Sequence, residues 1–155
     1  MATWAEFREG DPTLAAAGER LLQPNGDGTA FLATVRGDGG PRVHPVMPVL
    51  AGGCLHVFIV NLSPKHADLL VDGRYALHAL PPAAGGEEFY VTGDARFIES
   101  TSQRAEVVAA SGGRLGLHEF ESLFELDIQH VLYTVWANWG TAETWPEYRK
   151  WHSRD

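Results

Sequence analysis

The sequence predicts a mainly β protein: an antiparallel sheet or barrel with a few flanking helices. Short runs of apolar and β-forming residues recur along the middle of the chain, and glycine-rich turns separate most of them. The strands do not alternate with long helices, as βαβ units require. The chain has 155 residues, of which 45% are hydrophobic, so residues 1–155 are expected to form one domain with a sizeable core.

Residues 1–24 are predicted to be an N-terminal helical region. Asp11 and Pro12 suit the start of a helix, and apolar residues then share one face as far as Leu22. This helix should end before Pro24, because the residue that precedes a proline is disfavoured in the helical conformation.

Three strands are predicted next, over residues 29–36, 41–50 and 54–60. Residues 37–40 (GDGG) form a hairpin turn between the first two strands, and residues 51–53 (AGG) turn the chain into the third. The second strand contains three prolines, which cannot donate ladder hydrogen bonds. Parts of it must therefore lie at a sheet edge or be interrupted.

The remaining elements are predicted in the following order: a helix over 64–72, a fourth strand over 74–80, a fifth over 87–99, a helix over 101–110 and a sixth strand over 123–136. Gly93 near the middle of the fifth strand indicates a bulge or bend, as a closing barrel needs. The alternation of apolar and polar residues in the sixth strand shifts phase near His130, which indicates another bulge.

The C-terminal tail, residues 137–155, is unusually aromatic for its length. Four tryptophans lie in or just before it: Trp136, Trp139, Trp145 and Trp151. This aromatic area is too large to leave in water, so the tail is expected to pack either on the body of the protein or on a second chain.

Composition excludes several classes of function. The formal net charge of −8 argues against a general nucleic-acid or anionic-membrane surface. The single cysteine, Cys54, cannot form an intramolecular disulfide, and the N-terminal residues do not resemble a signal peptide. No segment approaches the roughly 20 apolar residues of a membrane span, so we expect a cytoplasmic location.

One stretch, residues 58–70 (FIVNLSPKHADLL), points to a binding site for an anion. The third strand ends there, and Ser63 and Pro64 are well suited to cap and start the short helix that follows. A helix start has unpaired N–H groups and a partial positive charge, and Lys65 adds an ammonium group. The stretch either binds a phosphate or is an ordinary capped turn with a solvated lysine.

Arg42 and His44 lie on one face of the second strand and would extend this polar site if that face looks toward Ser63 and Lys65. Alternatively, Arg42 is a solvated residue at the rim and His44 a hydrogen-bonded histidine of the sheet. We identify no catalytic acid, base or nucleophile: Cys54 has the pattern of a small core residue, and no metal-binding or phosphate-loop motif is present. This pattern suits a protein whose bound cofactor performs the chemistry.

The ordered run of residues 29–99 resembles the pyridoxamine 5′-phosphate oxidase-like, FMN-binding split-barrel family. The shared order is a strand, a glycine hairpin, a strand with an arginine and an x-Pro step, a strand, a Ser-x-Lys turn and a short helix. The resemblance implies a six-stranded antiparallel split barrel that forms a homodimer, with FMN bound at the subunit interface. The chain lacks the C-terminal Arg-x-His-type signature of true pyridoxamine phosphate oxidases, which argues against their vitamin substrate.

By position, the resemblance implies that Ser63 and Lys65 hold the FMN phosphate and that Arg42 assists them. The ribityl chain and ring would lie along two strand segments: His44, Pro45 and Val46, then Ile59, Val60 and Asn61. Trp136 or Trp139 of the partner subunit would cover the ring. The implied reaction is hydride transfer between the flavin and a small organic substrate. The alternatives are a deazaflavin-dependent reductase on the same fold, and a cofactor-binding, stress or sensor module without turnover; related split barrels also bind haem.

Overall fold

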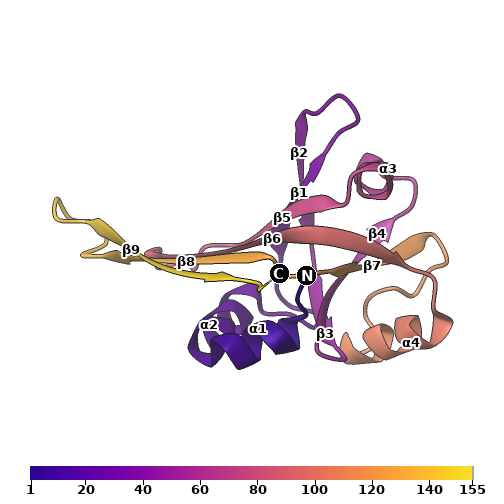
Figure 1. Ribbon diagram of the computed structural model, residues 1–155, viewed down its shortest axis with the longest axis horizontal. Coiled ribbons are helices and arrows are strands. Elements are labelled where there is room, and N and C mark those ends of the chain that lie inside the picture. The colour runs from indigo at the N-terminus through magenta and orange to yellow at the C-terminus, as the bar shows by residue number, and fades with distance from the viewer. Residues whose placement is uncertain (155) are drawn as a thin grey trace.

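The computed structural model describes residues 1–154, which form a mainly β antiparallel fold with flanking helices (Figure 1). Among these residues there are nine strands, not the six that were predicted. The strands are β1 (Ala30–Val35), β2 (Pro41–Val46), β3 (Pro48–Ala51), β4 (Cys54–Val60), β5 (Arg74–Ala79), β6 (Glu87–Ile98), β7 (Glu121–Leu126), β8 (His130–Ala137) and β9 (Trp145–His152). The helices are α1 (Trp4–Gly10), α2 (Pro12–Leu22), α3 (Pro64–Val71) and α4 (Thr101–Ala110).

The long strand β6 joins the two halves of the sheet. One of its edges pairs with β5, and its other edge pairs first with β8 and then with β7. The main path of the sheet runs β2-β1-β5-β6-β7-β4-β3, and β9 pairs only with β8. Every pairing is antiparallel, as the short strands and tight turns predicted.

Gly93 occupies the place on β6 where its partner changes from β8 to β7. A Cβ atom at this position would lie 2.2 Å from both the carbonyl oxygen and the Oδ1 of Asp127, in the segment that connects β7 to β8. The backbone of that segment crosses β6 closely, and only glycine leaves room for it. The bend predicted at Gly93 is thus the corner where one half of the sheet passes into the other.

Two predicted strands are each divided in the structure. The segment 41–50 forms β2, which pairs with β1, and β3, which pairs with β4; both lie at the ends of the sheet path. The prolines therefore had the expected effect of placing this segment at edges and interrupting it. The strand predicted over 123–136 is interrupted: β7 and β8 both pair with β6, and Asp127 to Gln129 form an irregular link where a bulge was predicted near His130. Asp127 and Gln129 of this link still donate to carbonyl oxygens of β6.

The N-terminal helices cover a large part of the core. The predicted helix is confirmed as α2, which begins with Pro12 and whose cap is Asp11. Helix α1 was not predicted, although Thr3 and Glu6 form a capping box at its start. Trp4 and Phe7 of α1 are fully buried, so this helix belongs to the core.

The tail forms an outer hairpin of β8 and β9, which extends away from the body of the protein (Figure 1). Trp151 packs on Phe7 with ring centroids 5.1 Å apart, so one end of β9 lies against the body. Trp139 and Trp145 instead keep 55% and 70% of their surface exposed. The extended end of the hairpin is free to contact another molecule. No helix in the part of the chain that the structure describes has the length and apolarity needed to cross a membrane.

We predict that Gly93→Ala lowers the free energy of unfolding by about 1–3 kcal/mol, because the added methyl group must displace the backbone of Asp127. Urea denaturation measures this loss. The matched control is Gly37→Ala, where an added Cβ meets no atom within 4 Å. Equal losses in the two variants would contradict the close crossing at Gly93.

Candidate functional site

The side chain of the N-cap residue of α3 makes no capping hydrogen bond to the first turn of this helix. Ser63 is the N-cap and Pro64 the first helical residue, as predicted, but no side chain caps this helix. The Ser63 hydroxyl instead donates to the carbonyl oxygen of Val60 at 2.7 Å. Pro64 has no N–H and His66 donates to the carbonyl oxygen of Ser63, so among the first three helical residues only Lys65 can offer its backbone N–H to a ligand.

Lys65, in this first turn, is a cation without a counterion. Its side chain is half-buried, and none of the residues 1–154 places a carboxylate within ion-pair distance of it. Burial lowers the pKa of Lys65, since the charged form loses part of its hydration. An anion bound here would restore a favourable partner for the ammonium group.

Arg42 faces α3, as its position on β2 allowed, but it already has a partner. Its Nε donates to Oδ2 of Asp68 at 2.7 Å, and the Thr34 hydroxyl donates to the same oxygen at 2.8 Å. Burial by itself would raise the pKa of Asp68, yet the hydrogen bonds from Arg42 and Thr34 outweigh it and the pKa is lowered. Asp68 is thus an ionised carboxylate that links α3 to β1 and β2.

His44 lies on the same face of β2 as Arg42, two residues further along the strand. It is half-buried, and its Nε2 is buried without a hydrogen-bond partner among the described residues. Burial lowers the pKa of His44, the charges of Lys65 and Arg42 lower it further, and Asp68 opposes them. The structure therefore brings Arg42, His44 and Lys65 into one electrostatic cluster.

A cavity of about 240 Å³ opens beside Lys65. Its lining is mostly apolar and comes from β2 and the residue after it, β4, α3, the α4–β7 loop and the start of β7. The lining residues are Pro45, Val46, Met47, Phe58, Val60, Lys65, Leu115 and Glu121. Binding sites for small molecules usually measure about 300–1,000 Å³. The cavity resembles part of such a site, open on one side.

The other predicted residues are placed as follows. The side chain of Ile59 is fully buried in the core, so only its backbone can face a ligand. Asn61 is exposed, and its N–H donates to the carbonyl oxygen of Phe120 at 2.7 Å. Trp136 and Trp139 lie on the outer hairpin, where Trp136 donates from Nε1 to Glu88. Within one chain the β8–β9 hairpin that carries them extends away from α3 (Figure 1).

Sequence reasoning missed Asp68 and the wall contributed by the α4–β7 loop. Asp68 follows Lys65 by three residues on α3, a spacing that places both on one side of the helix, so its role could have been anticipated. The presence of Leu115 and Glu121 in the cavity wall could not have been anticipated from the sequence. Arg104 holds this loop by donating to the carbonyl oxygens of Gly116 and His118 at 2.7 and 2.9 Å, contacts that no local pattern indicates.

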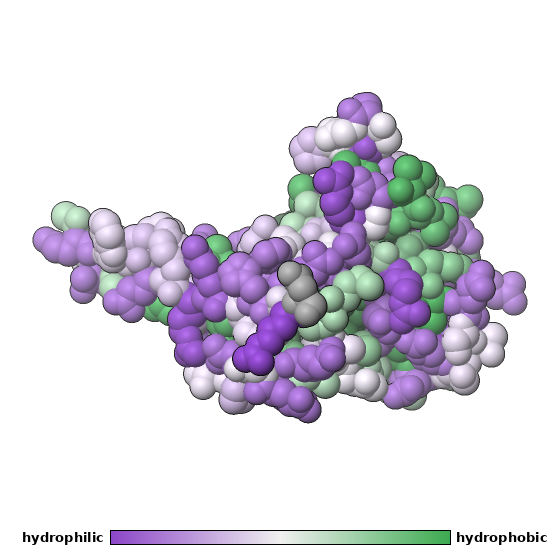
Figure 2. All heavy atoms as spheres, in the orientation of Figure 1, coloured by the Kyte–Doolittle hydropathy of each residue, from purple (hydrophilic) through white to green (hydrophobic). Residues whose placement is uncertain are grey.

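The surface around α3 is strongly apolar. Figure 2 shows hydrophobic residues gathered over this helix and the neighbouring strands. Leu62 and Val71 are 90% and 80% exposed, and Leu117 and Phe120 of the α4–β7 loop are also exposed. Large exposed apolar patches mark contact sites for another protein or a ligand.

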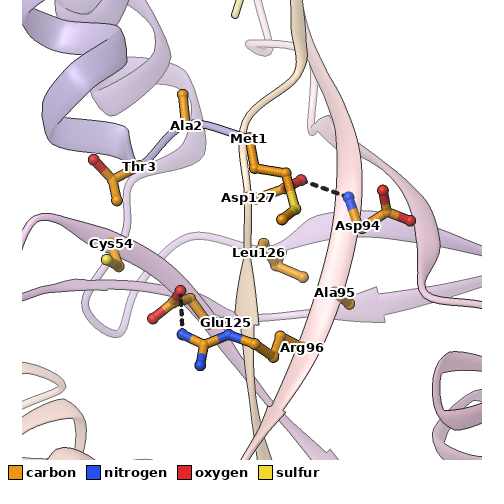
Figure 3. A pocket seen from close by; sticks show the side chains of 10 residues that line it. All are labelled: Met1, Ala2, Thr3, Cys54, Asp94, Ala95, Arg96, Glu125, Leu126 and Asp127. Atoms are coloured by element: carbon orange, nitrogen blue, oxygen red, sulfur yellow. Dashed lines mark hydrogen bonds and ion pairs between the residues drawn. The ribbon is translucent and has the colours of Figure 1, made fainter. Parts of the chain in front are cut away.

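A second cavity, of about 250 Å³, lies between the N-terminal segment and the sheet (Figure 3). Figure 3 shows the Arg96–Glu125 ion pair across it, with Cys54 on the neighbouring strand. Burial and the nearby Glu125 raise the pKa of Cys54 to about 11, so the thiol stays protonated near neutral pH. Cys54 is partly exposed and lines this cavity, so its predicted place in the core is not confirmed, and its raised pKa does not favour a role as a nucleophile.

No protein-family model and no curated protein matches the chain. Solved structures do share its fold. The heme-binding protein from Mycobacterium smegmatis has a TM-score of 0.62 at 18% identity over 84% of this chain, which spans only 55% of that protein. HutZ, the heme storage protein from Vibrio cholerae, has a TM-score of 0.62 at 20% identity over 75% of this chain and 90% of HutZ.

A structure named F420 reductase has a TM-score of 0.58 at 18% identity, over 73% of this chain and 94% of that one. At these identities the similarity concerns the fold alone. The fold is of the split-barrel type, as the sequence predicted.

We predict that Cys54 of the folded protein reacts with a thiol reagent at pH 8 about a hundredfold more slowly than a free thiol, because its pKa is about 11 and not the ordinary 9.0. The rate should keep rising through pH 9 without a plateau. The same protein unfolded in urea serves as the control, and a plateau below pH 9 in the folded state would contradict the raised pKa.

Proposed function

We propose that this protein is an FMN-binding oxidoreductase of the pyridoxamine 5′-phosphate oxidase-like type, which transfers hydride between the flavin and a small organic substrate. The observation that carries the proposal is the half-buried, unpaired ammonium group of Lys65 at the uncapped start of α3. Both features favour a dianionic phosphate. The apolar cavity that opens beside Lys65 suits the flat ring of a flavin.

The chain's own residues would bind and orient the cofactor. The ammonium group and the backbone N–H of Lys65 would hold the phosphate, while Pro45, Val46 and Val60 would lie along the cavity toward the ring. The flavin supplies the hydride chemistry when bound. Backbone N–H groups near the polar edge of the ring would stabilise the negative charge of the reduced form.

We propose further that the active form is a homodimer with its cofactor sites at the interface. A cavity of about 240 Å³ is small for a flavin, and exposed apolar residues such as Met47 and Val60 line it. A second copy would bury them and complete the site. Trp139, 55% exposed on the outer hairpin, is suited to cover the ring from the partner subunit.

Two other functions are supported by the named structural neighbours. A deazaflavin-dependent reductase is favoured by the match to F420 reductase, but its polyglutamate tail needs basic residues along a groove, and Lys65 is the one cation among the residues that line this cavity. A haem-binding or other cofactor-binding protein without turnover is favoured by the heme proteins of the same fold.

The visible absorption spectrum distinguishes these functions. We predict that FMN added to the purified protein, followed by removal of free cofactor, leaves a stoichiometric flavin spectrum. Retention of only the deazaflavin or only haem in parallel samples would support the corresponding alternative. Retention of none of the three would overturn the proposal.

We predict that Lys65→Ala weakens FMN binding by about 1–3 kcal/mol, because a charge-assisted contact to the phosphate is lost. Fluorescence titration with FMN measures the change. The matched control is Lys150→Ala, which removes the same charge from the exposed strand β9. Unchanged affinity in Lys65→Ala, or an equal loss in both variants, would contradict the phosphate assignment.

A further inference from the structure

The two cationic side chains of this cluster, Arg42 and Lys65, are not equally available to a ligand. Arg42 is bound to Asp68, whose carboxylate is only 7% exposed and also accepts from Thr34. Turning Arg42 toward a phosphate would leave a buried carboxylate without its counterion, which costs several kcal/mol. Lys65 alone then faces a phosphate that carries about −1.5 to −2 charges near neutral pH.

His44 is the remaining titratable base in this cluster. The charged groups that face it are Arg42 from its own strand β2 and Lys65 and Asp68 from α3, while β1 contributes the uncharged Thr34. Its buried Nε2 has no acceptor among residues 1–154. In the empty protein a proton on that nitrogen would therefore be buried, unpaired and close to two other cations.

We propose that His44 supplies the second positive charge of the phosphate site, taking up a proton when a phosphate dianion binds against Lys65. This inference rests on the proposed flavin function and assigns His44 a role in the charge balance of the site. His44 and Arg42 therefore have different roles, because the guanidinium group of Arg42 is already paired with Asp68.

His44 would take up a proton because the bound phosphate changes the electrostatic potential at its imidazole ring from positive to negative. Without ligand, burial and the charges of Lys65 and Arg42 hold the pKa of His44 below its ordinary value, so the imidazole is neutral near pH 7. A bound dianion would offset those cations and raise the pKa of a nearby base by about 1–3 units. Binding and protonation then favour each other.

The linkage predicts how affinity depends on pH. The pKa of His44 is low in the free protein and higher in the complex. FMN affinity therefore increases as the pH falls from the pKa of His44 in the complex toward its pKa in the free protein. The increase is at most tenfold per pH unit for one proton. The FMN phosphate itself gains a proton near pH 6, which opposes the effect equally in any variant.

The experiment measures dissociation constants for FMN and for riboflavin, which lacks the phosphate, between pH 6 and 8.5. We use the full-length wild-type protein, His44→Gln and His44→Asn, all shown to be folded by circular dichroism. Wild-type protein should bind FMN about tenfold more tightly at pH 6.5 than at pH 8, and both variants should lose most of that dependence. Riboflavin affinity should not show this increase. Titration calorimetry in two buffers of different ionisation enthalpy should detect proton uptake with FMN by the wild type only.

The outcomes separate this inference from the proposed function. FMN binding whose pH dependence is the same in the wild type and in both variants would overturn the role of His44 and leave the flavin function standing. An equal loss of FMN and riboflavin affinity at every pH in the variants would show a structural role only, and also overturns the inference. Failure of the wild type to bind either flavin at any pH would overturn the proposed function itself.

Discussion

A single buried carboxylate connects α3 to the sheet. Asp68 accepts from Thr34 of β1 and from Arg42 of β2, and its pKa is lowered although burial acts to raise it. Two donors on neighbouring strands thus position the helix relative to the sheet. Since Lys65 lies one turn earlier on α3, this contact also determines where the uncapped helix start faces.

This contact divides the positive charges of the site into different classes. Arg42 is neutralised by Asp68 and serves the fold, whereas Lys65 has no counterion among the described residues and is available to an anion. Burial and the charges of Lys65 and Arg42 lower the pKa of His44, and the carboxylate of Asp68 opposes them in part.

Local patterns predicted the elements whose cause is local. Proline positions indicated the division between β2 and β3, Asp11 and Pro12 marked the start of α2, and Gly93 indicated the corner in β6. What was missed depends on distant segments. Strand β9 forms only because β8 lies beside it, whereas the interruption between β7 and β8 lies where a bulge was predicted near His130. Likewise, Arg104 holds the α4–β7 loop in place by donating to its carbonyl oxygens, and no sequence pattern predicts these contacts.

The split-barrel fold does not by itself specify a cofactor, since structures named for heme and for F420 share it with this chain. The distinguishing features are charge and enclosure. A cation at a helix start suits a phosphate, a row of cations would suit a polyglutamate tail, and a base with a free nitrogen would suit an iron. This chain has the first feature in Lys65. It has no second lysine or arginine among the residues lining the cavity, and the free nitrogen of His44 is buried beside two positive charges, an unfavourable setting for a metal ion. The charge pattern around α3 therefore favours a compact phosphate over the other two cofactors.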